Sequence, residues 1–157
     1  MKFIRHFTSI FFLGFLLNCG NDIPFDQENF LNRPVGLQVT ALAGRQFQVS
    51  YSVQNQEKTF DGYNLYVARQ TIGDGELDAS VPALIFNGAT PTFQHGPEDF
   101  APNTVLTRVI SGINFTSTLQ FLCESSPPIT YYFRIAAHSR KGIRSDPSNE
   151  VTAVCQP

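Results

Sequence analysis

The sequence predicts an all-β fold, a β-sandwich of about seven or eight short strands, over most of its length. First, apolar and polar side chains alternate at period two in successive segments from Pro34 onward, as in strands that bury one face. Second, aromatic residues are plentiful, with 15 Phe and 5 Tyr, and such residues suit a pleated surface. Third, 11 Gly and 10 Pro residues are spread between these segments as turn signals. Because each strand has one apolar face to bury, two sheets must face one another.

Eight segments either carry this alternation or form short apolar runs between turn residues. Asp61-Gly62 precedes one of them, Ser111-Gly112 lies between two, and a turn containing Gly142 and Pro147 leads into the last. No convincing helical period and no internal repeat interrupts the series. The segments expected to be strands are 37–41, 47–53, 63–67, 83–86, 105–110, 115–122, 131–137 and 151–155.

The charge balance excludes two classes of contact. The formal net charge is −2, but Lys2 and Arg5 lie in an N-terminal segment that we expect to be removed. Without them the 11 basic residues fall to nine against 13 acidic ones, a net charge of −4. Nucleic-acid binding needs a basic surface that neutralises phosphates. The chain is therefore expected to bind no nucleic acid, and a polybasic contact with a membrane is excluded as well.

Residues 1–18 have the layout of a secretory signal peptide. Lys2 and Arg5 give a positive start, and Ile10–Leu17 form a short apolar run. This run is far below the ~20 apolar residues of a membrane-spanning helix, and the polar stretch Gly20-Asn21-Asp22 follows at once. The chain is therefore expected to be exported and cut before Cys19.

Leu16-Leu17-Asn18-Cys19 resembles the lipobox of bacterial lipoproteins, in which the cysteine is acylated and the preceding bond is cut. Leu16 fits the family pattern, whereas Leu17 and Asn18 stand where small residues are usual. The resemblance implies that Cys19 is lipidated and that the protein is anchored to a membrane of the cell envelope, at the outer membrane or cell surface rather than the inner membrane. The alternatives are an ordinary signal peptide with an incidental cysteine and a buried apolar helix. In the lipoprotein interpretation, residues 19–33 form the lipidated cysteine and a flexible tether, and residues 34–157 form the domain.

Both ends of residues 34–157 resemble a fibronectin type III domain. Thr130–Ala137 is similar to the penultimate strand of that family, Ser145–Ser148 to the loop that follows it, and Asn149–Ala153 to the last strand. Pro34–Val39 and Gly62–Val67 are similar to the first and third strands. The resemblance implies an immunoglobulin-like, fibronectin type III-like sandwich.

The resemblance also implies a role for Tyr131. It occupies the place of the tyrosine-corner residue, whose hydroxyl bonds back to the backbone a few residues upstream; plain core packing is the alternative. Two features depart from the family. Tyr51 stands where a buried Trp is usual, and the segment of about 71–103 is longer than the family allows. That enlarged middle segment is expected to hold an inserted loop or an extra strand.

If Cys19 carries lipid, Cys123 and Cys155 remain as an even pair in an exported protein. In the sandwich, Cys123 ends one strand near the turn that leads to Ile129, and Cys155 ends the last strand at the same pole. A disulfide between them is therefore expected, and on the chain-entropy estimate it would contribute ~3–4 kcal/mol to stability.

No catalytic motif is recognisable. The chain lacks a Gly-x-Ser-x-Gly elbow, a phosphate-binding glycine loop and a His-Glu-x-x-His run. Asp74, Glu76 and Asp78 lack the glycine and the later glutamate of a calcium loop. His95 and His138 lack partners at the spacing of zinc ligands. We therefore expect no enzyme activity, no metal and no cofactor.

Arg140, Lys141 and Arg144 bring three basic residues within five positions onto the loop before the last strand. In fibronectin-like domains that loop is a common contact site, and a solvated basic loop is the alternative. The expected function is a membrane-anchored, non-enzymatic protein-binding or adhesion-type module whose partner is another protein or an extracellular or envelope component. Two rival hypotheses are a structural or assembly lipoprotein with the sandwich as a spacer, and an enzyme or metal protein with its site in the middle segment.

Overall fold

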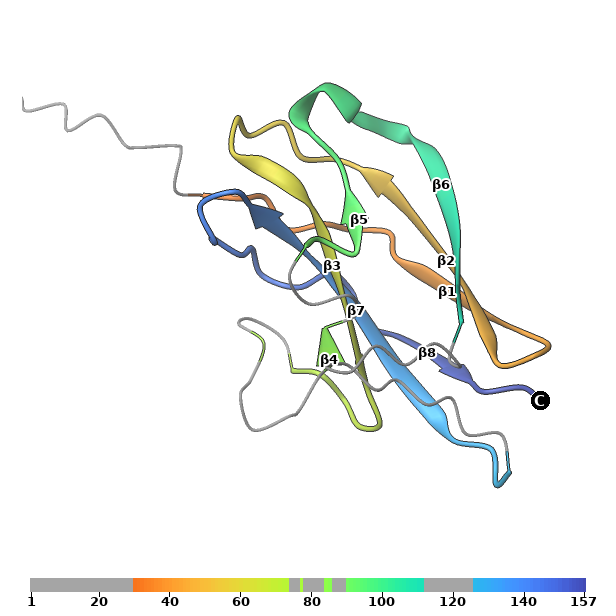
Figure 1. Ribbon diagram of the computed structural model, residues 1–157. Coiled ribbons are helices and arrows are strands. Elements are labelled where there is room, and N and C mark those ends of the chain that lie inside the picture. The colour runs from red at the N-terminus through yellow and green to blue at the C-terminus, as the bar shows by residue number, and fades with distance from the viewer. Residues whose placement is uncertain (1–29, 74–76, 78–83, 86–89, 112–125) are drawn as a thin grey trace, which may run out of the picture.

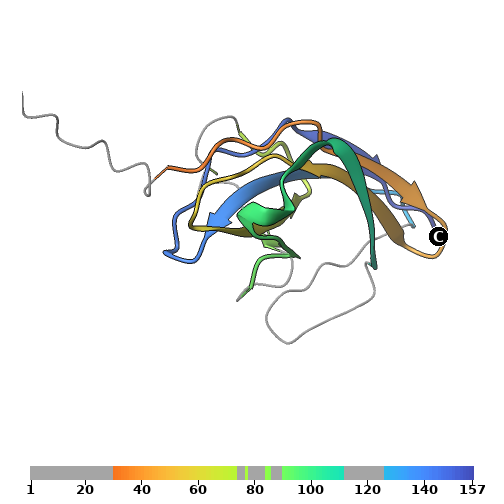
Figure 2. The same cartoon turned by 90° about the horizontal axis from the view of Figure 1, so that it is seen from above.

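Two antiparallel β-sheets make up the domain in the computed structural model, which describes residues 30–73, 77, 84–85, 90–111 and 126–157 (Figures 1 and 2). Within these ranges no helix is long and apolar enough to cross a membrane, and a single 3-10 turn spans Pro97–Asp99. The predicted all-β sandwich is confirmed. The strands are β1 Gln38–Leu42, β2 Gln46–Val53, β3 Phe60–Ala68, β4 Leu84–Ile85, β5 Phe93–Gln94, β6 Ala101–Ser111, β7 Thr130–Ser139 and β8 Val151–Val154.

The strand order is that of an immunoglobulin-like sandwich. One sheet has the order β1-β2-β6, and the other has the order β4-β3-β7-β8, with β5 also pairing with β3. In immunoglobulin-like folds the first, second and fifth main strands share one sheet, and the third, sixth and seventh share the other. With β4 and β5 as short additions, β1, β2 and β6 form the first set and β3, β7 and β8 form the second.

Period-two alternation places one face of each long strand in the core. In β2, the side chains of Phe47, Val49, Tyr51 and Val53 are all at most 1% exposed, and the intervening residues are half-buried. Phe47 reaches across to Phe133 of β7, with ring centroids 5.0 Å apart and the rings edge-on. Full burial of a large apolar side chain contributes ~1.5–3 kcal/mol, so this inner layer supplies the main stabilisation. The other fully buried large side chains include Tyr63, Phe60, Leu37, Leu65 and Ile135.

The folded domain begins before Pro34. Leu31 is 3% exposed and belongs to the core. The side chain of Asn55 donates to the Asn32 carbonyl at 3.0 Å. Residues 31–33, expected at the end of the tether, therefore pack against the sandwich.

Beside the second half of β7, which β8 does not pair with, two serine hydroxyls accept hydrogen bonds from the strand. The β7–β8 ladder covers Thr130 to Phe133. Beyond it the Ile135 N–H donates to Ser148 Oγ at 3.0 Å, and the Ala137 N–H donates to Ser145 Oγ at 2.9 Å. The serine hydroxyls thus satisfy buried strand amides that would otherwise lack acceptors.

The middle segment of about 71–103 contains β4, β5 and the 3-10 turn, and its start covers the outer face of the second sheet. Ile72 is fully buried there in a second small cluster. The Ile72 N–H donates to Glu150 Oε2 at 2.6 Å, and Glu150 pairs with Arg134 of β7 (Nε to Oε2, 3.6 Å). The expected strand at 115–122 lies outside the described residues. The neighbours of Ile72 in the cluster are Tyr66, Ala68, Ala136, Leu77 and Tyr132.

Candidate functional site

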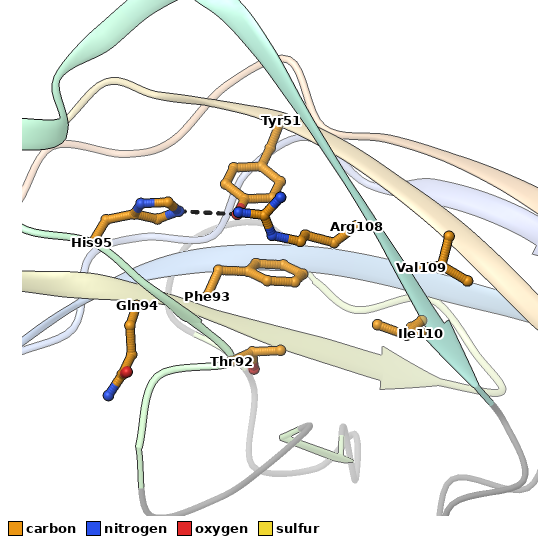
Figure 3. A pocket seen from close by; sticks show the side chains of 8 residues that line it. All are labelled: Tyr51, Thr92, Phe93, Gln94, His95, Arg108, Val109 and Ile110. Carbon is orange, nitrogen blue, oxygen red and sulfur yellow. Dashed lines mark hydrogen bonds between the residues drawn. The ribbon is translucent and has the colours of Figure 1, made fainter.

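A hollow of about 320 Å³ opens between the two sheets on the side bounded by β5 and β6 (Figure 3). Among the described strands, β6 is at the end of the first sheet, and β5 pairs with the edge of β3 opposite β7 in the second. The hollow therefore lies where the sandwich is open between the two layers. We call it the β5–β6 hollow; it is lined by Tyr51, Thr92, Phe93, Gln94, His95, Arg108, Val109 and Ile110.

β6 has an irregularity that begins opposite Tyr51, one of the lining residues. Tyr51 pairs with Leu106, and Val53 pairs with Ala101, so β6 uses five residue steps where β2 uses two. The extra residues include Pro102, which cannot donate to a strand ladder. Bulges of this kind bend an end strand and re-aim its side chains.

The β2–β6 register directs Arg108 to the inner side of the sheet. Paired residues of antiparallel strands lie on the same face, and Arg108 pairs with Val49 between Leu106–Tyr51 and Ile110–Phe47. All three β2 partners are core residues. Arg108 is nevertheless exposed, because the hollow leaves its guanidinium in contact with water. An inward-pointing charge on an end strand is one known means of blocking edge-to-edge pairing. The same geometry aims a cation into a hollow.

His95 links the wall of the hollow to Tyr51. The Tyr51 hydroxyl and His95 Nε2 are hydrogen-bonded at 2.9 Å, and His95 Nδ1 lies 3.5 Å from Asp99 Oδ2. The carboxylate favours a proton on Nδ1, which assigns the Tyr51 hydroxyl as the donor to Nε2. Burial lowers the pKa of His95, the Asp99 carboxylate opposes this, and the Arg108 guanidinium adds to the lowering. His95 is thus held as a neutral, oriented ring.

Aromatic packing fixes the floor of the hollow. The rings of Tyr51 and Phe93 are stacked with centroids 4.6 Å apart and an interplanar angle of 20°. Tyr63 packs edge-on against Tyr51 at 5.8 Å, and its hydroxyl donates to Asn55 Oδ1 at 2.9 Å. Burial raises the pKa of Tyr51 to about 12, with Arg108 opposing and Tyr63 adding to the increase. Tyr51 therefore remains a neutral hydrogen-bonding group across the physiological pH range.

The chemistry of the hollow favours binding over catalysis. Arg108 supplies a fixed positive charge with several donors. Tyr51 is hydrogen-bonded and its pKa is raised rather than lowered, which is the opposite of an activated nucleophile. In the part of the chain that the structure describes, no group of three or more His, Cys, Asp or Glu residues is arranged to hold a metal ion.

The basic loop residues Arg140, Lys141 and Arg144 have different surroundings. Arg140 Nε lies 3.3 Å from Asp61 Oδ1, in an ion pair whose arginine is 65% exposed. Such a surface pair contributes ~0–1 kcal/mol. Lys141 is exposed at the turn, whereas Arg144 lines a smaller hollow of about 140 Å³. That hollow is lined by Phe30, Leu31, Arg33, Ile143, Arg144, Ser145 and Asp146.

The other predicted positions are described only in part. Tyr131 is 2% exposed and packs edge-on against Phe47 at 6.2 Å. Residues 126–130, just upstream of Tyr131, are described, whereas Cys19 and Cys123 lie outside the described residues. Cys155 is buried, and its N–H donates to the Ile129 carbonyl at 3.2 Å. The tyrosine corner, the lipid anchor and the disulfide stay predictions.

Sequence reasoning missed Arg108 and the Tyr51–His95 pair. One signal for Arg108 was present, because Leu106, Arg108 and Ile110 form the apolar stripe of an expected strand with a charge at its centre. An arginine on an inward stripe indicates that one side of the sandwich is open. No comparable signal pointed to His95, whose partner lies 44 positions away in the chain.

Together, the strand order and the open side define an immunoglobulin-like β-sandwich with a polar hollow between its layers. Comparison with solved structures finds similarity to the FN1–FN3 domains of chicken CNTN1, with 14% sequence identity and a TM-score of 0.46. The match covers 81% of this chain and 33% of the CNTN1 chain, so this chain spans about a third of the length of the CNTN1 chain. At this distance the fold assignment rests on the chain's own sheets. No protein-family model matches the sequence, and comparison with curated proteins finds no match.

Proposed function

We propose that this chain is a lipid-anchored, non-enzymatic binding module of the cell envelope, which contacts its partner through the β5–β6 hollow. The observation that carries the proposal is Arg108, a charged side chain on the core-facing side of an end strand, aimed into a hollow of about 320 Å³. A rigid sandwich that holds such a group at its open side is suited to recognition. The partner is a protein or another envelope component.

The anchor in this proposal is Cys19, supported by the lipobox-like run Leu16–Cys19 after a short apolar segment. Two acyl chains on one residue hold a protein on a membrane far more firmly than a single chain does. Intact mass of the membrane-extracted protein tests this directly. The expected species lacks residues 1–18 and carries added acyl mass. A mass that retains residues 1–18, or one without acyl groups, contradicts the anchor.

The disulfide between Cys123 and Cys155 belongs to the same proposal, because export permits it. Its support is the position of Cys155, whose amide bonds to Ile129, six residues after Cys123. Non-reducing peptide mapping is expected to recover a linked pair of peptides containing these two cysteines. Recovery of both peptides with free thiols contradicts the pairing.

Capture from envelope extracts tests the binding surface. The membrane-extracted full chain serves as bait, and Arg108→Gln is compared with Arg140→Gln, a matched change at an exposed arginine of the basic loop. The proposal expects a partner that the wild type and Arg140→Gln retain and Arg108→Gln loses. Loss on replacing Arg140, Lys141 and Arg144 together by Ala, with capture by Arg108→Gln intact, would transfer the contact to the basic loop.

The competing structural role is an assembly subunit of the envelope. It is distinguished by concentration-dependent oligomers of the full chain in detergent, measured by sedimentation. If oligomers form and no Arg108-dependent partner is captured, the binding-module proposal is overturned in favour of the assembly role.

A further inference from the structure

We propose, on the basis of the proposed binding function, that the β5–β6 hollow is a site for a single carboxylate group carried on a small polar ligand, with Arg108 as the group that holds it. The proposal rests on the environment of Arg108, the net charge around it and the size of the hollow.

Arg108 has donors available for a ligand. Among the described residues its guanidinium forms no ion pair with an acidic side chain, and its Nη1 bonds only to the carbonyl of its neighbour Thr107, at 3.3 Å. A guanidinium presents five donors in a planar fork that matches the two oxygens of a carboxylate. Figure 3 shows the Arg108 side chain extending from β6 towards the side of the hollow that holds Tyr51 and His95. An entering anion would meet this fork at the mouth.

The charge around the hollow favours a monoanion. Arg108 is the one cation among the eight lining residues if His95 is neutral, and burial keeps the pKa of His95 low. Asp99, half exposed behind His95, adds a negative charge on that side. A phosphate group with nearly two charges would meet one arginine and a nearby carboxylate, whereas a carboxylate is matched by Arg108 alone.

The size and the remaining lining define the rest of the ligand. A hollow of about 320 Å³ stands at the lower end of the volumes usual for small-molecule sites, roughly 300–1,000 Å³. It suits one sugar ring or one terminal amino-acid residue. Phe93 and Ile110, paired with the core residues Tyr63 and Phe47, give the hollow an apolar surface beside Tyr51 and His95. Gln94 and Val109 alternate with them along β5 and β6, so their side chains point away from it. The Tyr51–His95 pair and the apolar side chains of Phe93 and Ile110 together suit a small polar ligand with one apolar face.

Calorimetric titration of the membrane-extracted full chain tests the proposal with four probes. Glucuronate carries the carboxylate on a sugar ring, N-acetylglycine carries it on a peptide end, glucose is the neutral counterpart, and inorganic phosphate is the more highly charged anion. We expect saturable binding of at least one carboxylate, no response to glucose and weaker binding of phosphate. The tighter of the two carboxylates identifies the source of the group.

Three variants separate the site from general charge effects. Arg108→Gln is expected to weaken carboxylate binding at least tenfold, and Arg108→Lys several-fold because it keeps the charge but loses the fork. Arg140→Gln is expected to bind as the wild type does. The proposal is overturned if neither carboxylate binds, if phosphate binds as tightly as they do, or if Arg108→Gln binds normally.

This test fails independently of the proposed function. If partner capture depends on Arg108 but no carboxylate binds, the binding module stands and the carboxylate site is overturned. If a carboxylate binds through Arg108 but partner capture does not need this residue, the site stands and the contact surface in the proposed function is overturned.

Discussion

The Tyr51 hydroxyl and His95 Nε2 are hydrogen-bonded at 2.9 Å, joining β2 of the first sheet to the residue that follows β5 of the second. This bond lies on the open side of the sandwich, where the end strands of the two sheets do not pair with each other. The stacked ring of Phe93 supports Tyr51 from the same segment. The Tyr51–His95 hydrogen bond and the Tyr51–Phe93 ring stack thus connect the two sheets on a side where their end strands do not pair.

Tyr51→Phe is expected to lower the free energy of unfolding by about 1 kcal/mol. The ring and its packing on Phe93 are preserved, but the buried partner of His95 Nε2 is removed, and a typical hydrogen bond contributes ~0.5–1.5 kcal/mol. Denaturant unfolding measures the change. Tyr63→Phe is the comparison, because its hydroxyl accepts from the Gln54 N–H and donates to Asn55. Since two partners lose a bond there, a smaller effect in Tyr63→Phe than in Tyr51→Phe contradicts this account.

Acidification is expected to destabilise the fold through His95. Its pKa lies below the ordinary value of 6.5, because burial and, more weakly, Arg108 disfavour the charged ring, while Asp99 favours it. The other groups that face His95 are the rings of Tyr51 and Tyr63, which carry no charge. The unfolded chain therefore binds this proton more readily than the folded one. The free energy of unfolding then falls as the pH drops from above 6.5 towards the lowered pKa.

The matched variant for this pH effect is His95→Gln, which keeps a hydrogen-bonding group near Tyr51 but cannot titrate. We expect the wild type to lose more stability than the variant between pH 7.5 and the acidic side of 6.5, measured by denaturant unfolding at each pH. Parallel pH dependences for the two proteins would assign the acid sensitivity to other groups.

The sequence predicted the sandwich because the evidence for it is local. Alternation such as Phe47, Val49, Tyr51 and Val53 reports which face of a strand is buried, whatever its partner. The hollow depends instead on non-local features. Its second wall is β5, a strand of two residues within a segment that has no alternation. The inward position of Arg108 depends on the register of β6 against β2, which no residue pattern in either strand encodes alone.

Ser148→Ala is expected to destabilise the domain by about 1–3 kcal/mol, although the change is small. Ser148 is fully buried, and its Oγ accepts from the Ile135 N–H at 3.0 Å. Ile135 lies beyond the part of β7 that pairs with β8. Removing the hydroxyl leaves a buried strand amide without an acceptor, which costs that amide's desolvation. Ser50→Ala is the control, because its hydroxyl contact with Thr107 is exposed. Equal unfolding midpoints for the two variants would contradict the role assigned to Ser148.

Gly62→Ala is expected to disrupt the pairing of β5 with β3 and, through it, the β5–β6 hollow. Gly62 has φ of +135° and pairs with Gln94, and a Cβ at this position would overlap the carbonyl oxygen of Phe93.

Gly44→Ala is the matched control. It also has a positive φ, +74°, but no atom lies within 4 Å of the added Cβ, so it carries only the backbone cost of ~1–2 kcal/mol. The effect of Gly62→Ala should exceed this, because β5 must move away from β3. Amide hydrogen exchange distinguishes the two: faster exchange at residues 92–95 is expected in Gly62→Ala alone. If both variants exchange alike in that segment, the close approach of β3 and β5 does not hold the wall of the hollow in place.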